Sequence, residues 1–141
     1  MKTIREHLEK LPCWLMSVVV LGVILWLTLA SHPFGDDAPS FFEGEDKVAH
    51  GLMFLALTVV LLFDKRHAAG VPVLSRGYVL TASAMTMLLG LAIEFAQEAM
   101  GMGRTFSLGD IVADVIGVMA GAIIWVLTAG CGEVGEDACD N

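Results

Sequence analysis

The sequence predicts an all-α membrane protein that folds as a four-transmembrane-helix bundle with both termini in the cytoplasm. Three observations predict this class. The 141 residues are 56% hydrophobic, and their mean hydropathy of +0.73 is too high for an ordinary soluble domain. The apolar residues gather in four long runs, and a helix needs about 20 such residues to cross a hydrocarbon core. Lys and Arg gather on alternate connections between the runs.

The four runs make one membrane domain over residues 12–130, with predicted spans at about 12–30, 48–63, 78–97 and 111–130. Residues 1–11 form a basic cytoplasmic N-terminus. We interpret the first run as a retained span rather than a signal peptide, because no clear small-x-small cleavage site follows it. Residues 131–141 form an acidic cytoplasmic tail, which we expect to be a short disordered end.

The basic residues predict the orientation of the spans. Three precede the first run, three lie between the second and third runs, and each of the other two connections holds one: Lys2, Arg5 and Lys10, then Lys65, Arg66 and Arg76, then Lys47 and Arg104. Lys and Arg near span ends mark the cytoplasmic side. We therefore expect a multi-pass protein of the bacterial cytoplasmic (inner) membrane, N-in and C-in. The net charge of -8 argues against a nucleic-acid partner.

A first group of polar residues opens the second predicted span. Asp46 and His50 are four residues apart and Lys47 and His50 are three apart, so the group shares one side of a helix. The functional interpretation is a patch that binds a ligand or moves a proton. The structural alternative is that Lys47 marks the membrane interface and one interhelical hydrogen bond satisfies His50. Lys47 and His50 are candidate ligand-binding residues.

A carboxylate and an amide close the third predicted span. Glu94 and Gln97 lie three residues apart on one helical face, and an apolar triplet before Glu94 places it below the lipid surface. A carboxylate there must be paired, protonated or hydrated. Both residues are candidates for ligand binding. The structural alternative is an ion pair of Glu94 with Arg104 or Lys47 that fixes the helix register.

The third connection leads into the fourth span through Arg104, Ser107 and Asp110. Ser107 with an acid three residues later is typical of a helix cap before the run that begins at Ile111. Asp110 in the first turn also suits the helix dipole. Arg104 is a candidate to bind an anion, and Asp110 is a candidate for the same site with the cap as its structural alternative.

Four residues of the fourth span form one helical stripe. Asp110, Asp114, Gly117 and Gly121 are spaced by four, three and four residues. Two glycines four residues apart permit close helix packing, which is the role we expect for Gly117 and Gly121. If the glycines face a neighbouring helix, Asp114 also points into the bundle, and it joins the candidate ligand-binding residues.

The predicted outer ends of the spans carry an excess of acids. With His50 neutral, four acids stand against two bases: Asp46, Glu94, Asp110 and Asp114 against Lys47 and Arg104. A protonated His50, a protonated acid or a bound cation would each relieve this excess in a poor dielectric, and the sequence leaves the choice open. No spaced metal motif such as HExxH is present, so we expect no metal site and no cofactor.

Three motifs together resemble the VanZ-like family of small bacterial membrane proteins. They are DKVAHG at 46–51, IEFAQ at 93–97 and GRTFSLGDIVADVIGVMAG at 103–121. The resemblance implies a four-span layout and family positions at Asp46, Lys47, His50, Glu94, Gln97, Arg104, Ser107, Asp110, Asp114 and Gly117. The family commonly has asparagine where this chain has Asp114. Its founding association is with resistance to the glycopeptide teicoplanin, and the resemblance does not settle a biochemical activity.

Three functions remain open. In the first, a non-enzymatic cell-envelope protein binds an amphiphilic, anionic ligand such as a lipid-linked wall precursor or a glycolipid, with Lys47 and Arg104 on its charged groups. In the second, an intramembrane hydrolase or transferase acts on a lipid head group, with Glu94 or His50 as general base. In the third, the charged residues brace the bundle or an oligomer interface. Membrane lipids are the expected partners, and a homo-oligomer is left open.

Overall fold

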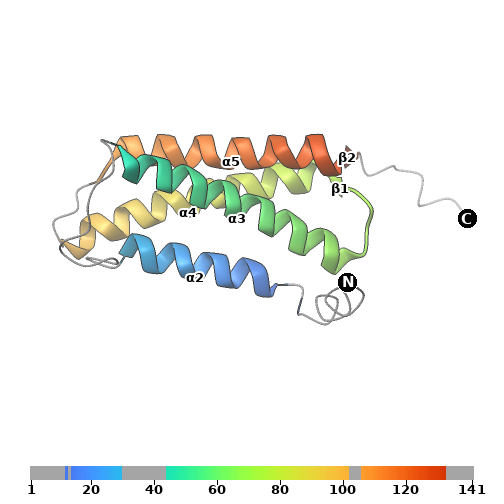
Figure 1. Cartoon of the computed structure of the whole chain (residues 1–141), viewed down its shortest axis with the longest axis horizontal. Coiled ribbons are helices and arrows are strands. Elements are labelled where there is room, and N and C mark those ends of the chain that lie inside the picture. The colour runs from blue at the N-terminus through green and yellow to red at the C-terminus, as the bar shows by residue number, and fades with distance from the viewer. Residues whose placement is uncertain (1–11, 13, 30–43, 102–105, 133–141) are drawn as a thin grey trace, which may run out of the picture.

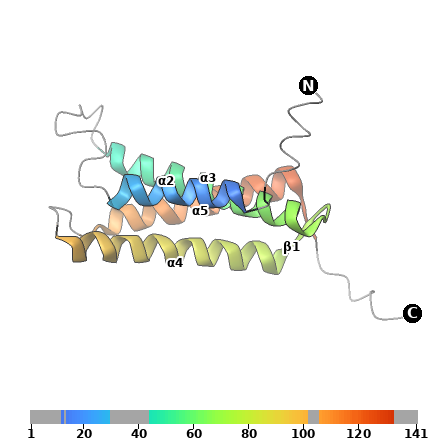
Figure 2. The ribbon, with the colours of Figure 1, turned by 90° about the horizontal axis from the view of Figure 1, so that it is seen from below.

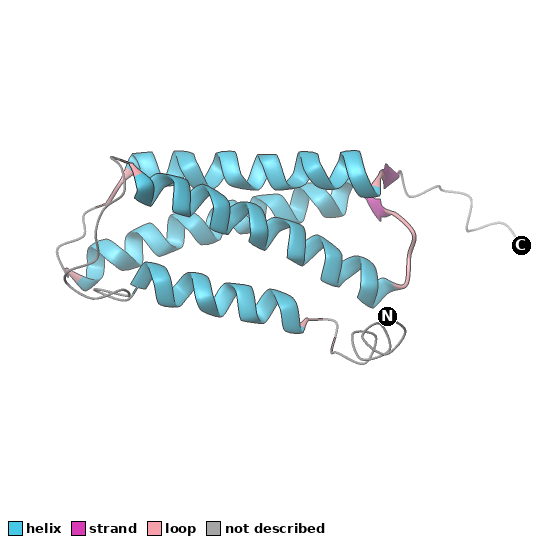
Figure 3. Ribbon diagram, viewed as in Figure 1, coloured by secondary structure: helices cyan, strands magenta, loops and turns pink. Residues whose placement is uncertain are grey.

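The computed structural model describes residues 12, 14–29, 44–101 and 106–132, and these residues are nearly all helical (Figure 3). The elements are α2 (Leu15–Leu29), α3 (Glu45–Ala69), β1 (Leu74–Ser75), α4 (Arg76–Met100), α5 (Leu108–Ala129) and β2 (Cys131–Gly132). The two short strands pair in parallel, Leu74 with Cys131 and Ser75 with Gly132. The all-α class predicted from the sequence is confirmed.

Successive helices run in opposite directions along one bundle axis (Figures 1 and 2). We call the end where α2 and α4 end and α3 and α5 begin the cluster end. The opposite end, where β1 pairs with β2, is the strand end. Because of this alternation, the candidate residues His50, Glu94 and Asp114 of the second, third and fourth predicted spans all lie at the cluster end.

Three of the four helices, α3, α4 and α5, are long and apolar enough to span a membrane. The fourth, α2, is apolar but has 15 residues, a length of about 22 Å at the helical rise of 1.5 Å per residue. Large apolar side chains on all four helices point away from the bundle, among them Trp26, Leu80, Ile116 and Leu127. Such an all-round apolar exterior is typical of helices that face lipid.

The structure differs from the predicted second connection, 64–77, at its start. α3 continues through the charged residues after Phe63 and ends at Gly70, whose positive φ of 63° forms the helix C-cap. Within this extra turn, Asp64 Oδ2 accepts hydrogen bonds from Ser17 N at 2.9 Å and Ser17 Oγ at 2.6 Å. Asp64 therefore satisfies a free N–H in the first turn of α2, which is why this charged residue stays in the helix and is buried.

Glycines bring α5 against α3, the helix pair with the most extensive contact. A methyl group added at Gly121 would lie 2.9 Å from the Leu55 carbonyl oxygen, and one added at Gly117 would overlap the carbonyl group of Gly51. The two backbones thus meet where the Gly-xxx-Gly spacing of α5 predicts close packing. Buried apolar side chains fill the bundle in two clusters, one around Phe54 beside this crossing and one around Trp125 nearer the strand end.

Candidate functional site

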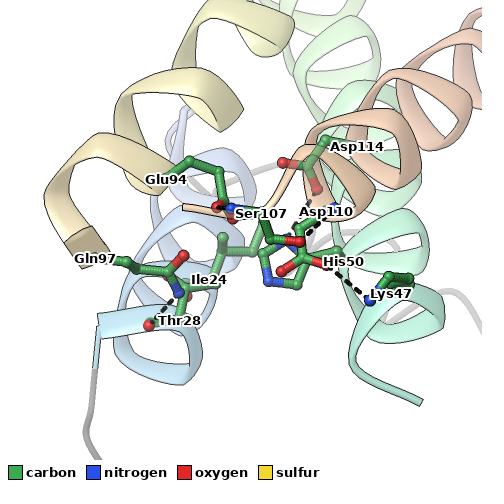
Figure 4. Close-up of polar contacts among 9 residues, drawn as sticks. All are labelled: Ile24, Thr28, Lys47, His50, Glu94, Gln97, Ser107, Asp110 and Asp114. Atoms are coloured by element: carbon green, nitrogen blue, oxygen red, sulfur yellow. Dashed lines mark hydrogen bonds and ion pairs between the residues drawn. The ribbon is translucent and has the colours of Figure 1, made fainter. Parts of the chain in front are cut away.

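Four buried ionisable residues from three helices meet at the cluster end. His50, Glu94 and Asp114 are each 1% exposed, and Asp110 is 7% exposed. Together with Lys47, whose side chain is about half exposed, they form what we call the polar cluster (Figure 4). Ionisable residues inside membrane helices are costly and are usually kept for function, so this cluster is the candidate site.

The innermost contact of the polar cluster joins α3 to α5. His50 Nδ1 lies 3.1 Å from Asp114 Oδ1, so His50 has the interhelical hydrogen bond that its structural interpretation required. The other carboxylate oxygen, Asp114 Oδ2, has no hydrogen-bond partner among the described residues. A methyl group at Gly90 of α4 would lie 2.6 Å from this oxygen, so Gly90 gives Asp114 its space.

Glu94 connects α4 to the start of α5. Its Oε2 atom accepts a hydrogen bond from Ser107 N at 3.0 Å (Figure 4). Ser107 is the N-cap of α5, and its Oγ atom accepts from Asp110 N at 3.3 Å. In a capping box, the acid three residues after the cap binds the N–H of the cap residue. Here a carboxylate from another helix takes that place, so the side chain of Asp110 remains available for other contacts.

Asp110 uses this freedom to contact Lys47. The Lys47 Nζ atom lies 3.6 Å from Asp110 Oδ1, an ion pair without a hydrogen bond, and the lysine stem passes close over Gly109. Of the two ion pairs that the sequence suggested for Glu94, the one with Lys47 is absent among the described residues, where Lys47 pairs with Asp110. The other suggested partner, Arg104, lies outside the described residues. The physical reason is that the stem of Lys47 lies against Gly109 in the first turn of α5, which brings its ammonium group beside the neighbouring Asp110.

Gln97 ties the end of α4 to the end of α2. Its Nε2 atom donates a 2.7 Å hydrogen bond to the carbonyl oxygen of Thr28, and both residues are buried. Gln97 thus lies one turn beyond Glu94 and closes the cluster end on the α2 side (Figure 4). Sequence reasoning missed Thr28, because a backbone carbonyl acts as an acceptor whatever the residue type.

The sequence groups two further residues, Arg104 and Asp46, with these side chains. Arg104, a candidate anion ligand, lies outside the described residues. Asp46 is exposed one turn before His50, and one ligand atom each from Asp46, His50 and Asp110 lie within 4.8 Å of one another. The four-residue spacing of Asp46 and His50 was the sequence signal for this group, and the approach of Asp110 to it comes from the crossing of α3 and α5.

The chemistry of the polar cluster follows from its unpaired acceptors. Glu94 Oε1, Asp110 Oδ1 and Asp114 Oδ2 are buried and have no hydrogen-bond donor among the described residues. Buried acceptors without partners are destabilising by about 1–3 kcal/mol each, more when charged. The arrangement is suited to an occupant that supplies hydrogen-bond donors or positive charge. The Asp114–His50 pair also orients an imidazole as a proton-transfer group requires.

The comparisons with known proteins give one finding. A family model described as VanZ/LLP1 matches residues 14–129, which include all four helices. No curated protein and no solved structure shows significant similarity to the chain.

Proposed function

The chain belongs to the VanZ/LLP1 family, and on this premise we propose that it is a cell-envelope protein of the bacterial inner membrane. It binds the polar head of an amphiphilic envelope ligand, a lipid-linked wall precursor or a glycolipid, in the polar cluster. The observation that carries the proposal is the set of buried carboxylate oxygens without hydrogen-bond donors among the described residues, which α4 and α5 bring to one end of the bundle. A role in resistance to glycopeptides such as teicoplanin would follow from capture of a wall precursor.

The proposed orientation places the cluster end outside the cytoplasm. The strand end carries Lys65, Arg66 and Arg76 around the end of α3 and the start of α4, and basic residues favour the cytoplasmic side. The N-in and C-in arrangement requires four spans, so α2 must cross the membrane as well as α3, α4 and α5. Local thinning of the bilayer would accommodate the short length of α2. The variant Glu98→Cys checks this orientation: we expect its thiol to react with a membrane-impermeant reagent in intact cells. A protected thiol at position 98, together with a reactive thiol at the strand end, would show the opposite orientation.

The unpaired acceptors define the kind of head group. Glu94 Oε1 and Asp114 Oδ2 can each accept a hydrogen bond from a hydroxyl or ammonium group, which sugars and aminated head groups supply. Lys47 stands beside them as a half-exposed cation for a phosphate or carboxylate of the same ligand. A head group with both hydroxyls and a negative charge therefore complements the cluster.

The apolar exterior supports an amphiphile rather than a water-soluble ligand. Leu108 and Val112 in the first turns of α5 and Phe95 next to Glu94 are more than half exposed. Acyl or isoprenoid chains lying on these residues would keep contact with a head group held in the polar cluster. Lipid-facing and head-group-facing residues thus occur side by side on the same helices.

Replacing Glu94 tests the proposed binding site. Glu94→Gln keeps an oxygen for the Ser107 N–H but turns the second acceptor into a donor, so the fold persists while the ligand loses a charged hydrogen bond. Such a bond contributes about 1.5–3 kcal/mol, and we expect affinity for the bound lipid to fall about tenfold or more. The measurement is the thermal shift of purified protein against a panel of envelope glycolipids and lipid-linked sugar phosphates.

The matched control is Glu98→Gln, which removes the same charge one turn later at an exposed position. This variant is expected to bind as the wild type does. The proposed site would be contradicted if both variants lost affinity for the lipid equally, or if the lipid raised the melting temperature of Glu94→Gln as much as that of the wild type. If no lipid stabilises the wild type and Glu94→Gln only melts lower, the cluster is an internal brace.

A second candidate function is an intramembrane hydrolase or transferase acting on a lipid head group. The observation that favours it is the buried Asp114–His50 pair, because a carboxylate that orients an imidazole is a common device for general base catalysis. To separate the two functions, the wild-type protein is incubated with a lipid that stabilises it but does not stabilise Glu94→Gln. Release of a head group by the wild type supports the enzyme, and an unchanged lipid rejects it.

A further inference from the structure

We propose that Asp46, His50 and Asp110 bind a divalent metal cation at the cluster end, in contrast to the sequence-based expectation of no metal site. The inference goes beyond the proposed lipid binding, since metal binding is measurable with no lipid present. It rests on the arrangement of these side chains around the start of α3 and α5, which no single sequence motif encodes.

The ligand atoms of the three residues are close enough for one ion. One atom from each residue lies within 4.8 Å of the other two. Two ligands of a Zn²⁺ ion, each about 2.0–2.2 Å from the metal, stand at most about 4.4 Å apart. Asp46 is exposed, so its side chain has room to adjust toward an ion.

The contact between His50 and Asp114 prepares the imidazole as a ligand. With Nδ1 hydrogen-bonded to Asp114 Oδ1, the Nε2 atom is the ring nitrogen left for a metal. Metal-binding histidines usually donate their other N–H to a carboxylate, which fixes the tautomer and raises the basicity of the ligand. Asp114 would be a positioning residue for this site rather than a metal ligand.

An independent observation on α4 also indicates a cation. Glu94 is 1% exposed, and its Oε1 atom has no hydrogen-bond donor among the described residues. In Figure 4 its side chain extends from α4 toward His50 and Asp110. A cation bound by Asp46, His50 and Asp110 would stabilise this buried carboxylate oxygen by its positive charge, with a bound water between them.

The balance of charge supports the same conclusion. Asp46 and the acids of the polar cluster, Glu94, Asp110 and Asp114, stand against Lys47 of the same cluster, whose side chain is about half exposed. A divalent cation would relieve the acid excess. Lys47 Nζ lies 3.6 Å from Asp110 Oδ1, so the lysine competes with the metal for this carboxylate.

The ligand types select the class of metal. An imidazole with carboxylates suits Zn²⁺ or Mn²⁺, whereas Mg²⁺ and Ca²⁺ prefer oxygen ligands alone. We therefore infer a borderline transition-metal cation, and the probes are Zn²⁺ and Mn²⁺ with Mg²⁺ for comparison.

The test is titration of chelator-treated, tag-free protein in detergent with Zn²⁺ and Mn²⁺, followed by calorimetry and metal analysis. We expect one tightly bound ion per chain and much weaker binding of Mg²⁺. Asp46→Asn removes an exposed ligand without disturbing the core and is expected to weaken binding tenfold or more. Glu98→Gln is the matched control and is expected to bind as the wild type does. Lys47→Ala removes the competing cation and is expected to tighten binding.

Wild-type protein that binds no stoichiometric ion, or Asp46→Asn protein that binds as tightly as wild type, would overturn the metal site. Electron paramagnetic resonance of the Mn²⁺-loaded protein adds a spectroscopic test, because coupling to an imidazole nitrogen is expected and its absence excludes His50 as a ligand. Repeating the lipid thermal shift with chelated and metal-loaded protein separates the two proposals. If lipids stabilise the protein but no metal binds, the proposed lipid binding is supported and the metal site is rejected. If a metal binds but no lipid stabilises the protein, the metal site is supported and the proposed lipid binding is rejected.

Discussion

Gly117→Ala is expected to lower the thermal stability of the protein more than any other single methyl group added to its helices. The new methyl group would overlap the backbone carbonyl of Gly51, and neither atom is part of a flexible side chain that could move aside. α3 and α5 must then separate along their shared contact. Overpacking costs about 1–3 kcal/mol or more, so we expect the melting temperature to fall by about 10 °C or the protein not to accumulate.

The matched control for this variant is Gly22→Ala in α2. A methyl group at Gly22 meets no atom within 4 Å, and alanine is the better helix former by about 0.8–1.0 kcal/mol. Gly22→Ala is therefore expected to melt at the wild-type temperature or slightly above it. Thermal unfolding of both variants in the same detergent makes the comparison. Equal melting of Gly117→Ala and wild type would show that α3 and α5 do not meet through their glycines.

Asp114→Ala is expected to be the second strongly destabilising change. It leaves the Nδ1 atom of His50 without a partner at a position that is 1% exposed. Removing one partner of a buried, charge-assisted pair costs about 3–5 kcal/mol. We expect a fall of about 10 °C or more in the melting temperature, with loss of expression as the extreme case.

Asp114→Asn separates the hydrogen bond from the charge. Asparagine keeps a side-chain oxygen that can accept from His50, and it is the residue that the VanZ-like resemblance implies at this position. We expect it to fold with a loss of less than about 1.5 kcal/mol, the net contribution of a typical hydrogen bond. If Asp114→Asn and Asp114→Ala melt at the same temperature, the ionised carboxylate rather than the hydrogen bond holds His50.

Local spacing along the chain determined the parts of the site that lie within one helix. The apolar runs predicted helices where α2 to α5 occur, and the cap at Ser107 follows from the residue types at its own turn. The spacing of Asp110, Asp114, Gly117 and Gly121 predicted one face of α5, and that face meets α3. These features depend on the helical period alone, so one sequence is enough to find them.

Because successive helices run in opposite directions, the sequence also determined that the candidate ionisable residues of α3, α4 and α5 meet at one end of the bundle. His50 opens α3, Glu94 lies near the end of α4, and Asp110 and Asp114 open α5, so alternate running directions bring them together. The sequence alone predicted this convergence, and neither the ligand nor the membrane orientation was needed for it.

Tertiary structure alone decided the partners of these residues. Glu94 binds the Ser107 N–H, Gln97 binds the Thr28 carbonyl, and Asp46 and Asp110 approach His50 together. The partner of Asp64, within the part of α3 that continues beyond the predicted span, is likewise Ser17 of another helix. Backbone donors and acceptors are the same at every residue, and the distances between helices are set by where small residues let them cross. The spacing of glycines in one helix predicts a close crossing, but the partner residues on the other helix and the backbone groups that meet there are decided only by the fold.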